Sequence, residues 1–184
     1  MTDSKKPGPA DIAAGWWREL TSDTAAGRLP RGVRRAALAE MRRAKSPLEI
    51  LQQPAALRLI GNLPPLLADR GAILAGILAH VREDDRRDVA RAIGRATFDD
   101  PDSAVMSESR FRRLMQTEED GLLEAMRRLV RLMNGKVNVA DLAKATLCWG
   151  DDVKKTWIFR YYDPYGTHAP KAATPPAPAD SPLT

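Results

Sequence analysis

Hydrophobic residues recur every three to four positions along most of the chain, which is the spacing of amphipathic helices. The longest example begins at prolines 64–65 and runs to residue 81. It contains few acids or bases, so we expect a central, well-buried helix with Leu66 and Leu67 among its core residues. No segment has a convincing strand pattern, and no internal repeat is visible. The pattern therefore predicts an all-α protein.

Capping residues, prolines and glycines divide this pattern into about eight to nine helices. Asp11 can cap the first helix, and the sequence 46–49, Ser-Pro-Leu-Glu, has the form of a capping box with proline at the first helical position. Residues 84–96 predict a charged helix, and Asn138 can cap another that runs to Trp149. We expect these helices to form one compact bundle.

The helices are predicted to form two packed subdomains, an N-terminal one of residues 11–98 and a C-terminal one of residues 103–162. The boundary would lie in the acidic loop at residues 99–102. Residues 1–10 and the tail of residues 167–184, which is rich in proline and alanine, are expected to be disordered.

Two features of the apolar pattern carry expectations about individual side chains. Trp16 and Trp17 are adjacent, so we expect one ring in the core and the other at a subdomain or subunit contact, with base stacking as the less favoured alternative. Cys148 is the single cysteine, which excludes an internal disulfide, and its apolar neighbours indicate a buried thiol.

The chain of 184 residues has a formal net charge of +5, and arginine carries most of its basic charge. Arginine suits bidentate contacts with phosphate, so an acidic partner such as nucleic acid is a candidate. Many arginine-rich proteins are basic for other reasons, and the placement of the arginines therefore has to decide between these interpretations.

The predicted helix at residues 31–45 has an uncompensated basic side, because Glu40 is its only acid. At about 100° per residue, five cations share roughly a third of the circumference with Leu38. These cations are Arg31, Arg34, Arg35, Arg42 and Lys45. Another side, formed by Val33, Ala37 and Met41, is expected to face the core. A solvated helix face usually mixes charges of both signs, so we favour phosphate contacts for this stripe.

Two later helices show the same imbalance. In residues 106–116 we expect Ser107 to cap a helix, and the apolar residues of this helix, Phe111, Leu114 and Met115, to face the core. Arg110 and Arg113 are expected to point towards phosphates, while the role of Arg112 is left undecided. The helix at residues 118–133 begins with acids and ends with Arg127, Arg128 and Arg131 in one sector. The helix dipole explains part of this polarity, but not the absence of acids among the three arginines.

The pattern of chemically reactive residues argues against an enzyme. The two histidines, His80 and His168, lie too far apart in sequence for a metal-ligand pair, and His80 is best explained as structural or incidental. There is no glycine-rich phosphate loop, and capping accounts for most acids, although a carboxylate-metal nuclease is the enzymatic alternative. We expect no catalytic residues, metal or cofactor.

The chain also lacks membrane and export signals. No apolar run approaches the roughly 18 to 20 residues that span a membrane, and the N-terminal residues lack the apolar core of a signal peptide. We therefore expect a cytoplasmic protein with no membrane partner.

Several segments together resemble CasB, the small subunit of the type I-E CRISPR surveillance complex, Cascade. The resemblance covers roughly residues 11–162, and each motif alone is weak, but their order and spacing match. The segments are Trp16-Trp17, Arg42-Arg43 ahead of Pro47, residues 106–114, residues 126–130, Val137-Asn138-Val139, Trp149-Gly150 and Trp157.

The resemblance implies an all-helical, non-enzymatic subunit, two copies of which stack head to tail beside the guide RNA and target DNA. Its expected partners are both nucleic acids, the other Cascade subunits and a second copy of itself. In such RNA-guided assemblies base pairing supplies the sequence specificity, so backbone contacts suffice for the small subunit. The alternative is a helical protein–protein scaffold whose basic faces meet acidic partner subunits.

The resemblance implies a nucleic-acid-binding role for Arg42, Arg43, Arg110, Arg113, Arg127, Arg128 and Arg131. The stripe of the helix at residues 31–45 adds Arg31, Arg34 and Arg35 to the predicted contact set.

Overall fold

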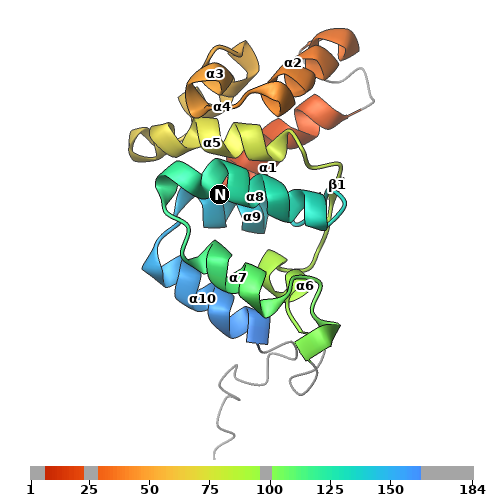
Figure 1. Ribbon diagram of the computed structural model, residues 1–184. Helices are drawn as coiled ribbons and strands as arrows, with labels where there is room; N and C mark the ends of the chain where they lie inside the picture. The colour runs from red at the N-terminus through yellow and green to blue at the C-terminus, as the bar shows by residue number, and fades with distance from the viewer. Residues whose placement is uncertain (1–6, 23–28, 96–100, 163–184) are drawn as a thin grey trace, which may run out of the picture.

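The computed structural model describes residues 7–22, 29–95 and 101–162, and the predicted tail at residues 167–184 lies outside them. The described part is mostly helical, with eight helices of seven or more residues and two short ones, which confirms the predicted all-α class. The helices are α1 (Pro9–Thr21), α2 (Arg31–Arg43), α3 (Pro47–Leu51), α4 (Pro54–Asn62), α5 (Ala68–Leu78), α6 (Val89–Ile93), α7 (Glu108–Met115), α8 (Glu119–Leu132), α9 (Val139–Leu147) and α10 (Asp151–Tyr162) (Figure 1). Two 3-10 helices, η1 (Pro65–Leu67) and η2 (Pro101–Ser103), precede α5 and α7.

Two of the predicted helix starts are confirmed by side-chain caps. The Ser46 hydroxyl accepts a hydrogen bond of 3.2 Å from the Glu49 backbone N–H, and the Asn138 side chain accepts one of 2.8 Å from Asp141 N–H. These contacts satisfy backbone donors that the first turn of a helix leaves without a partner. Helix α1 begins at Pro9, two residues before the predicted cap Asp11, whose carboxylate instead accepts from the Gly8 N–H at 3.1 Å.

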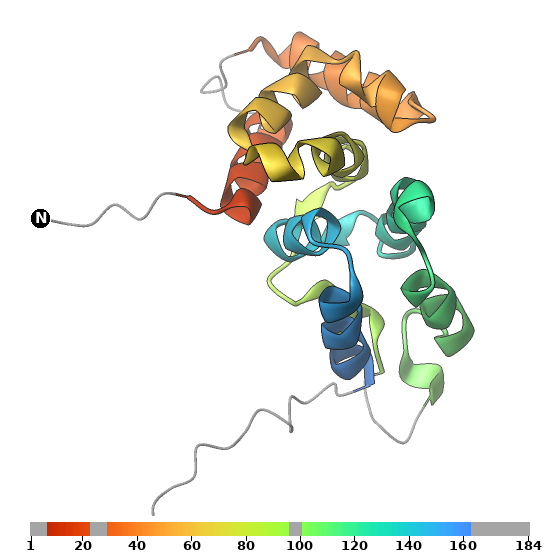
Figure 2. The ribbon, with the colours of Figure 1, turned by 90° about the vertical axis from the view of Figure 1, so that its left-hand side faces the viewer.

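The helices are arranged in three tiers (Figures 1 and 2). The upper tier consists of α2, α3 and α4 at the top and of α1 and α5 directly beneath them. Helices α8 and α9 form the middle, where α8 packs against α5, and α9 against both α5 and α1. Helices α6, α7 and α10 lie at the bottom, with α6 packed on α10. Helices that precede the predicted subdomain boundary at residues 99–102 therefore pack against helices that follow it, and the division into two subdomains remains a prediction.

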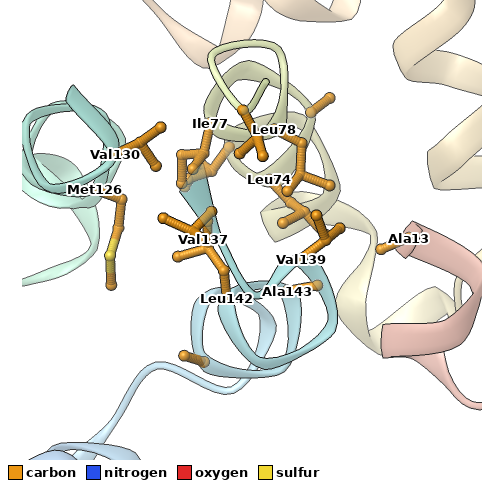
Figure 3. Packing of buried hydrophobic residues seen from close by; sticks show 14 of the residues in the cluster. Ala13, Leu74, Ile77, Leu78, Met126, Val130, Val137, Val139, Leu142 and Ala143 are labelled. Atoms are coloured by element: carbon orange, nitrogen blue, oxygen red, sulfur yellow. The ribbon is translucent and has the colours of Figure 1, made fainter. Parts of the chain in front are cut away.

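The core is centred on α5, whose residues 71–78 are all buried, as the apolar pattern predicts. Figure 3 shows Leu74, Ile77 and Leu78 of α5 facing Met126 and Val130 of α8 on one side and side chains of α9 on the other. Burial of this helix on several sides at once explains why it contains so few charged residues. Leu66, predicted to belong to the same core, lies in η1 instead and is 94% exposed.

A minimal parallel ladder connects the halves of the chain. Strand β1 (Glu83–Asp84) pairs with β2 (Lys136–Val137), with Glu83 opposite Lys136. This ladder occupies the start of the predicted helix at residues 84–96, and α6 is the helical part of that range within the described residues. Helix α6 starts late because the carboxylate of Asp84 accepts a hydrogen bond of 2.9 Å from Val139 N–H, while that of Asp141 accepts one of 2.8 Å from Val89 N–H.

The expectation of a buried Cys148 is wrong. Trp16 and Trp17 are both buried, which suits a core position or a subdomain contact for either ring, and their indole N–H groups donate to the carbonyl oxygens of Ala55 at 2.8 Å and Val81 at 3.3 Å. Helix α1 has neighbours on more than one side, so adjacent rings can each find a core contact. Cys148 is exposed at the C-terminal end of α9, although the residues on either side of it are buried.

Candidate nucleic-acid interface

The buried side of α2 differs from the predicted one. Arg34, Leu38 and Met41 face the interior, while Val33, predicted to face the core, is 50% exposed. Arg34 is 2% exposed, and its guanidinium donates a hydrogen bond of 2.7 Å to the carbonyl oxygen of Glu19 near the end of α1. Arg34 thus joins α1 and α2.

Arg127 is the second predicted contact residue that lies inside the protein, with 3% of its surface exposed. Its guanidinium donates to the carbonyl oxygens of Ala44 at 2.7 Å, Met41 at 2.8 Å and Gly76 at 3.2 Å. A buried cation with this many backbone acceptors is satisfied within the fold and offers no donor to a phosphate. We therefore do not propose Arg34 and Arg127 as phosphate contacts.

Four of the predicted arginines converge on one cleft between α7 and α8, which lie next to each other on one side of the molecule (Figure 1). This cleft, which we name the α7–α8 cleft, has a volume of about 530 Å³ and an apolar floor that includes Leu114, Leu129 and Leu132. The arginines that line it are Arg110 and Arg113 of α7 and Arg128 and Arg131 of α8. Two basic sectors that the sequence places on separate helices therefore form one surface.

Within the described residues, the arginines of this cleft have no acidic partner. Arg110, Arg113 and Arg131 make no ion pair there, and Arg128 donates only to the backbone oxygen of Glu124, one turn earlier in its own helix, at 3.2 Å. Arg112, which the sequence left undecided, forms an ion pair with Glu108 and does not line the cleft. Glu108 raises the pKa of Arg112. The cleft is therefore a concentration of positive charge that an anion would relieve.

Aromatic packing beneath α7 holds its arginines in place. Phe111 is buried and stacks on Tyr161 of α10, with ring centroids 3.9 Å apart and planes 10° from parallel. The Tyr161 hydroxyl donates a hydrogen bond of 2.7 Å to the carbonyl oxygen of Met106, just before α7. With Phe111 and Leu114 buried, the remaining side of the helix presents Arg110 and Arg113 to the cleft.

A second basic cleft, the α2 cleft, lies between α2 and the segment that follows α5. It has a volume of about 720 Å³ and is lined by Arg31, Arg34, Arg35, Arg42 and Arg82, with Leu20, Leu38 and Val81 among its apolar residues. Arg42 donates a hydrogen bond of 2.5 Å to the carbonyl oxygen of Ala79, and burial together with the nearby Arg82 lowers the pKa of Arg42. Arg43, a member of the predicted contact set, lines neither cleft and pairs with Glu40 at 2.8 Å, so we do not propose it as a phosphate contact.

Arg82 belongs to this surface, although sequence reasoning missed it. It follows the buried helix α5 in the chain and precedes three acids, residues 83–85, so its charge looks locally compensated. No helical periodicity relates it to the stripe on α2. Only the tertiary structure, which brings the end of α5 next to α2, could have identified it.

A third cleft, of about 540 Å³, includes arginines that the sequence did not single out, but its charges are largely paired. Arg87 lies 3.2 Å from Asp85, Arg91 lies 3.7 Å from Asp88, and Arg95 lies 2.9 Å from Glu108. Internal ion pairs of this kind reduce the attraction for an external anion. The α2 and α7–α8 clefts are therefore the better candidates.

Among the described residues, no group of three or more histidine, cysteine, aspartate or glutamate side chains is placed to hold a metal ion. None of the helices in that part of the chain combines the length and apolar character that crossing a membrane requires.

Comparisons with known proteins agree on one family. The family model of the CRISPR-associated protein Cse2 matches residues 37–162 of the chain. CasB from Thermus thermophilus is similar in structure, with a TM-score of 0.59 and 20% sequence identity over 85% of this chain and 99% of that chain. A chain of E. coli Cascade, in a crystal structure bound to a PAM-containing double-stranded DNA target, has a TM-score of 0.58 and 18% identity over 83% of this chain and 95% of that chain. No curated protein sequence matches this chain.

Proposed function

We propose a function from the premise that the chain belongs to the CRISPR-associated Cse2 family and is therefore a Cse2 subunit of a type I-E Cascade surveillance complex. In this function it binds the sugar-phosphate backbones of guide RNA and target DNA without reading their sequence. In this role it stabilises the opened DNA strands and acts without a catalytic step or a cofactor. Its other partners are further Cascade subunits and a second copy of itself.

The observation that carries this proposal is the α7–α8 cleft, where four arginines from two helices meet and none has an acidic partner among the described residues. Guanidinium groups bind phosphate oxygens by two parallel hydrogen bonds, and they do so with any base sequence. The E. coli relative comes from a complex bound to double-stranded DNA, which supports nucleic acid as the anion.

Modest backbone contacts are sufficient for such a role. Exchanging a DNA duplex for an RNA–DNA heteroduplex is nearly balanced in free energy, so a few additional contacts with the strands tip the equilibrium. The described residues that line the cleft include no aromatic ring on which a base could stack, which favours contacts with the backbone over contacts with bases.

The experiment compares two variants that each lose three positive charges. In the cleft variant, Arg110, Arg113 and Arg128 are replaced by glutamine. In the control, glutamine replaces arginines that form ion pairs outside the α7–α8 and α2 clefts, namely Arg43, Arg87 and Arg112. Fluorescence anisotropy with labelled single-stranded and duplex oligonucleotides, over a series of salt concentrations, gives the affinity and its salt dependence.

We expect the cleft variant to bind single strands at least about tenfold more weakly and to lose about two from the slope of log affinity against log salt, since each contact contributes about 0.7. The control should lose less than half of this. Equal losses in both variants would show a general charge effect and contradict the proposal. Binding of the wild type only to purified partner subunits, with none to DNA or RNA, would favour the scaffold role instead.

A further inference from the structure

Three helices meet around the imidazole of His80, which follows the end of α5. From α2, Arg42 donates its hydrogen bond of 2.5 Å to Ala79, the residue before His80. From α8, Arg127 binds the carbonyl oxygens of Met41 and Ala44 and thereby holds the end of α2 against α8. These contacts bring Arg42 and the last turn of α8 to the same place, which we name the His80 junction.

The charges at the His80 junction are unbalanced. Burial lowers the pKa of His80 to about 4, with further contributions from Arg127, Arg131 and Arg42, and Glu124 is the one acid that acts in the opposite direction. The Nε2 atom of His80 is buried and has no hydrogen-bond partner among the described residues. The imidazole is thus held neutral among three guanidinium groups.

These guanidinium groups differ in how many of their nitrogens already donate a hydrogen bond within the protein. Backbone carbonyls engage all three nitrogens of Arg127. Arg42 uses only its Nε in the bond to Ala79 and keeps its two terminal nitrogens. The side chain of Arg131 makes no hydrogen bond or ion pair with the described residues. Arg82 lies close enough to Arg42 to lower the pKa of that residue.

Residues of the His80 junction line both basic clefts. Arg42 and Arg82 line the α2 cleft, while Arg131 lines the α7–α8 cleft. An anionic chain that followed both clefts would pass the junction, where its charge would relieve the repulsion among the arginines.

We infer that Arg42, Arg82 and Arg131 bind one phosphodiester group of a nucleic-acid strand beside His80, so that a single strand passes from the α2 cleft to the α7–α8 cleft. This inference rests on the proposed function and adds to it the path of the strand. A consequence follows for protonation: a phosphate beside His80 offsets the surrounding positive charge, so binding makes the protonated imidazole more favourable.

The test uses nuclear magnetic resonance of the full chain, which contains only two histidines, His80 and His168. The imidazole signals, assigned with a His168→Gln variant, are followed against pH with and without an oligothymidylate of about twelve nucleotides. Binding of the same oligonucleotide is measured in parallel by anisotropy. We expect the pKa of His80 to rise by about one pH unit or more on binding.

Two single variants make the test specific. Arg131→Gln should raise the pKa of His80 in the free protein, because it removes one of the cations, and should diminish the further rise on binding. Arg43→Gln is the matched control, since Arg43 pairs with Glu40 and does not act on His80. The pKa of His80 should be the same in this variant as in the wild type, and an equal change in both variants would overturn the inference.

A second measurement does not require spectra at low pH. Because binding favours protonated His80, the affinity of the wild type for the oligonucleotide should increase more steeply than that of a His80→Gln variant as the pH falls towards about 4. If the oligonucleotide binds with the expected salt dependence, but the pKa of His80 and this pH dependence are unchanged, the junction site is wrong while the proposed function stands. If the oligonucleotide does not bind at all, both are wrong.

Discussion

The guanidinium group of Arg127 donates a hydrogen bond of 2.7 Å to the carbonyl oxygen of Ala44, so that an arginine of α8 caps the C-terminal end of α2. The last carbonyl groups of a helix have no partner within it and carry the negative end of its dipole. Arg127 satisfies two of them, those of Met41 and Ala44, with a single cation. This cap determines how the arginines of α2 lie relative to those of α8.

Replacement of Arg127 by methionine should lower the free energy of unfolding by about 3 kcal/mol, because carbonyl oxygens at the end of α2 lose their partner in the interior. Urea denaturation followed by circular dichroism measures this loss. Arg128→Met is the matched control: its side chain is exposed and bonds only within its own helix, so we expect a change within about 0.5 kcal/mol. Equal stability of the two variants would contradict the capping role.

Gly94 lies where α6 approaches α10, and a Cβ atom at this position would lie 2.5 Å from the carbonyl oxygen of Tyr161. Because the obstacle is backbone, we expect Gly94→Ala to destabilise the protein by about 1 to 3 kcal/mol. Gly15→Ala is the opposite case, since nothing lies within 4 Å of that Cβ and alanine favours the helix by about 0.5 to 1 kcal/mol. Thermal unfolding of the two variants should show shifts of opposite sign.

The lowered pKa of His80 predicts a loss of stability in acid. In the unfolded chain the imidazole takes up a proton near pH 6.5, whereas in the folded protein it does so only near pH 4. Between these values the unfolded state binds more protons, so the free energy of unfolding falls as the pH is lowered through this window and then levels off. Water screens the partly exposed ring, and we expect a loss on the order of 1 to 2 kcal/mol.

The measurement is the urea midpoint as a function of pH for the wild type and for His80→Gln. Carboxylates titrate in both proteins, so the difference between the two curves isolates His80. The wild type should lose stability relative to the variant between about pH 6.5 and about pH 4. Parallel curves across this range would show that His80 titrates normally.

Arg35 tests the α2 cleft separately from the α7–α8 cleft. It is exposed, lines the α2 cleft, and has no acidic partner among the described residues. Arg35→Gln should weaken oligonucleotide binding about equally for all sequences and reduce the salt slope by roughly one. Arg43→Gln, with its arginine paired to Glu40, should change the slope by less than half as much. If both substitutions leave the slope unchanged, the α2 cleft makes no phosphate contact.

Sequence alone was sufficient for features that depend on near neighbours in the chain. Ser46 and Asn138 cap helices as expected, because a cap involves residues three positions apart. The burial of α5 also followed from its composition, since a helix that is apolar on all sides has to be enclosed. The order of the motifs identified the family, and the matching of residues 37–162 confirms it.

The tertiary structure decided which arginines are available to a ligand. Helical periodicity shows that Arg34 and Arg35, or Arg127 and Arg128, lie close together on one helix, but not which of each pair meets a neighbouring helix. An arginine has a long apolar stem and several donors, so it can be buried wherever carbonyl groups of another helix end lie within reach. Glu19 supplies that acceptor for Arg34, and Met41 and Ala44 supply it for Arg127. These acceptors come from distant parts of the chain, and only the packing of the helices brings them together.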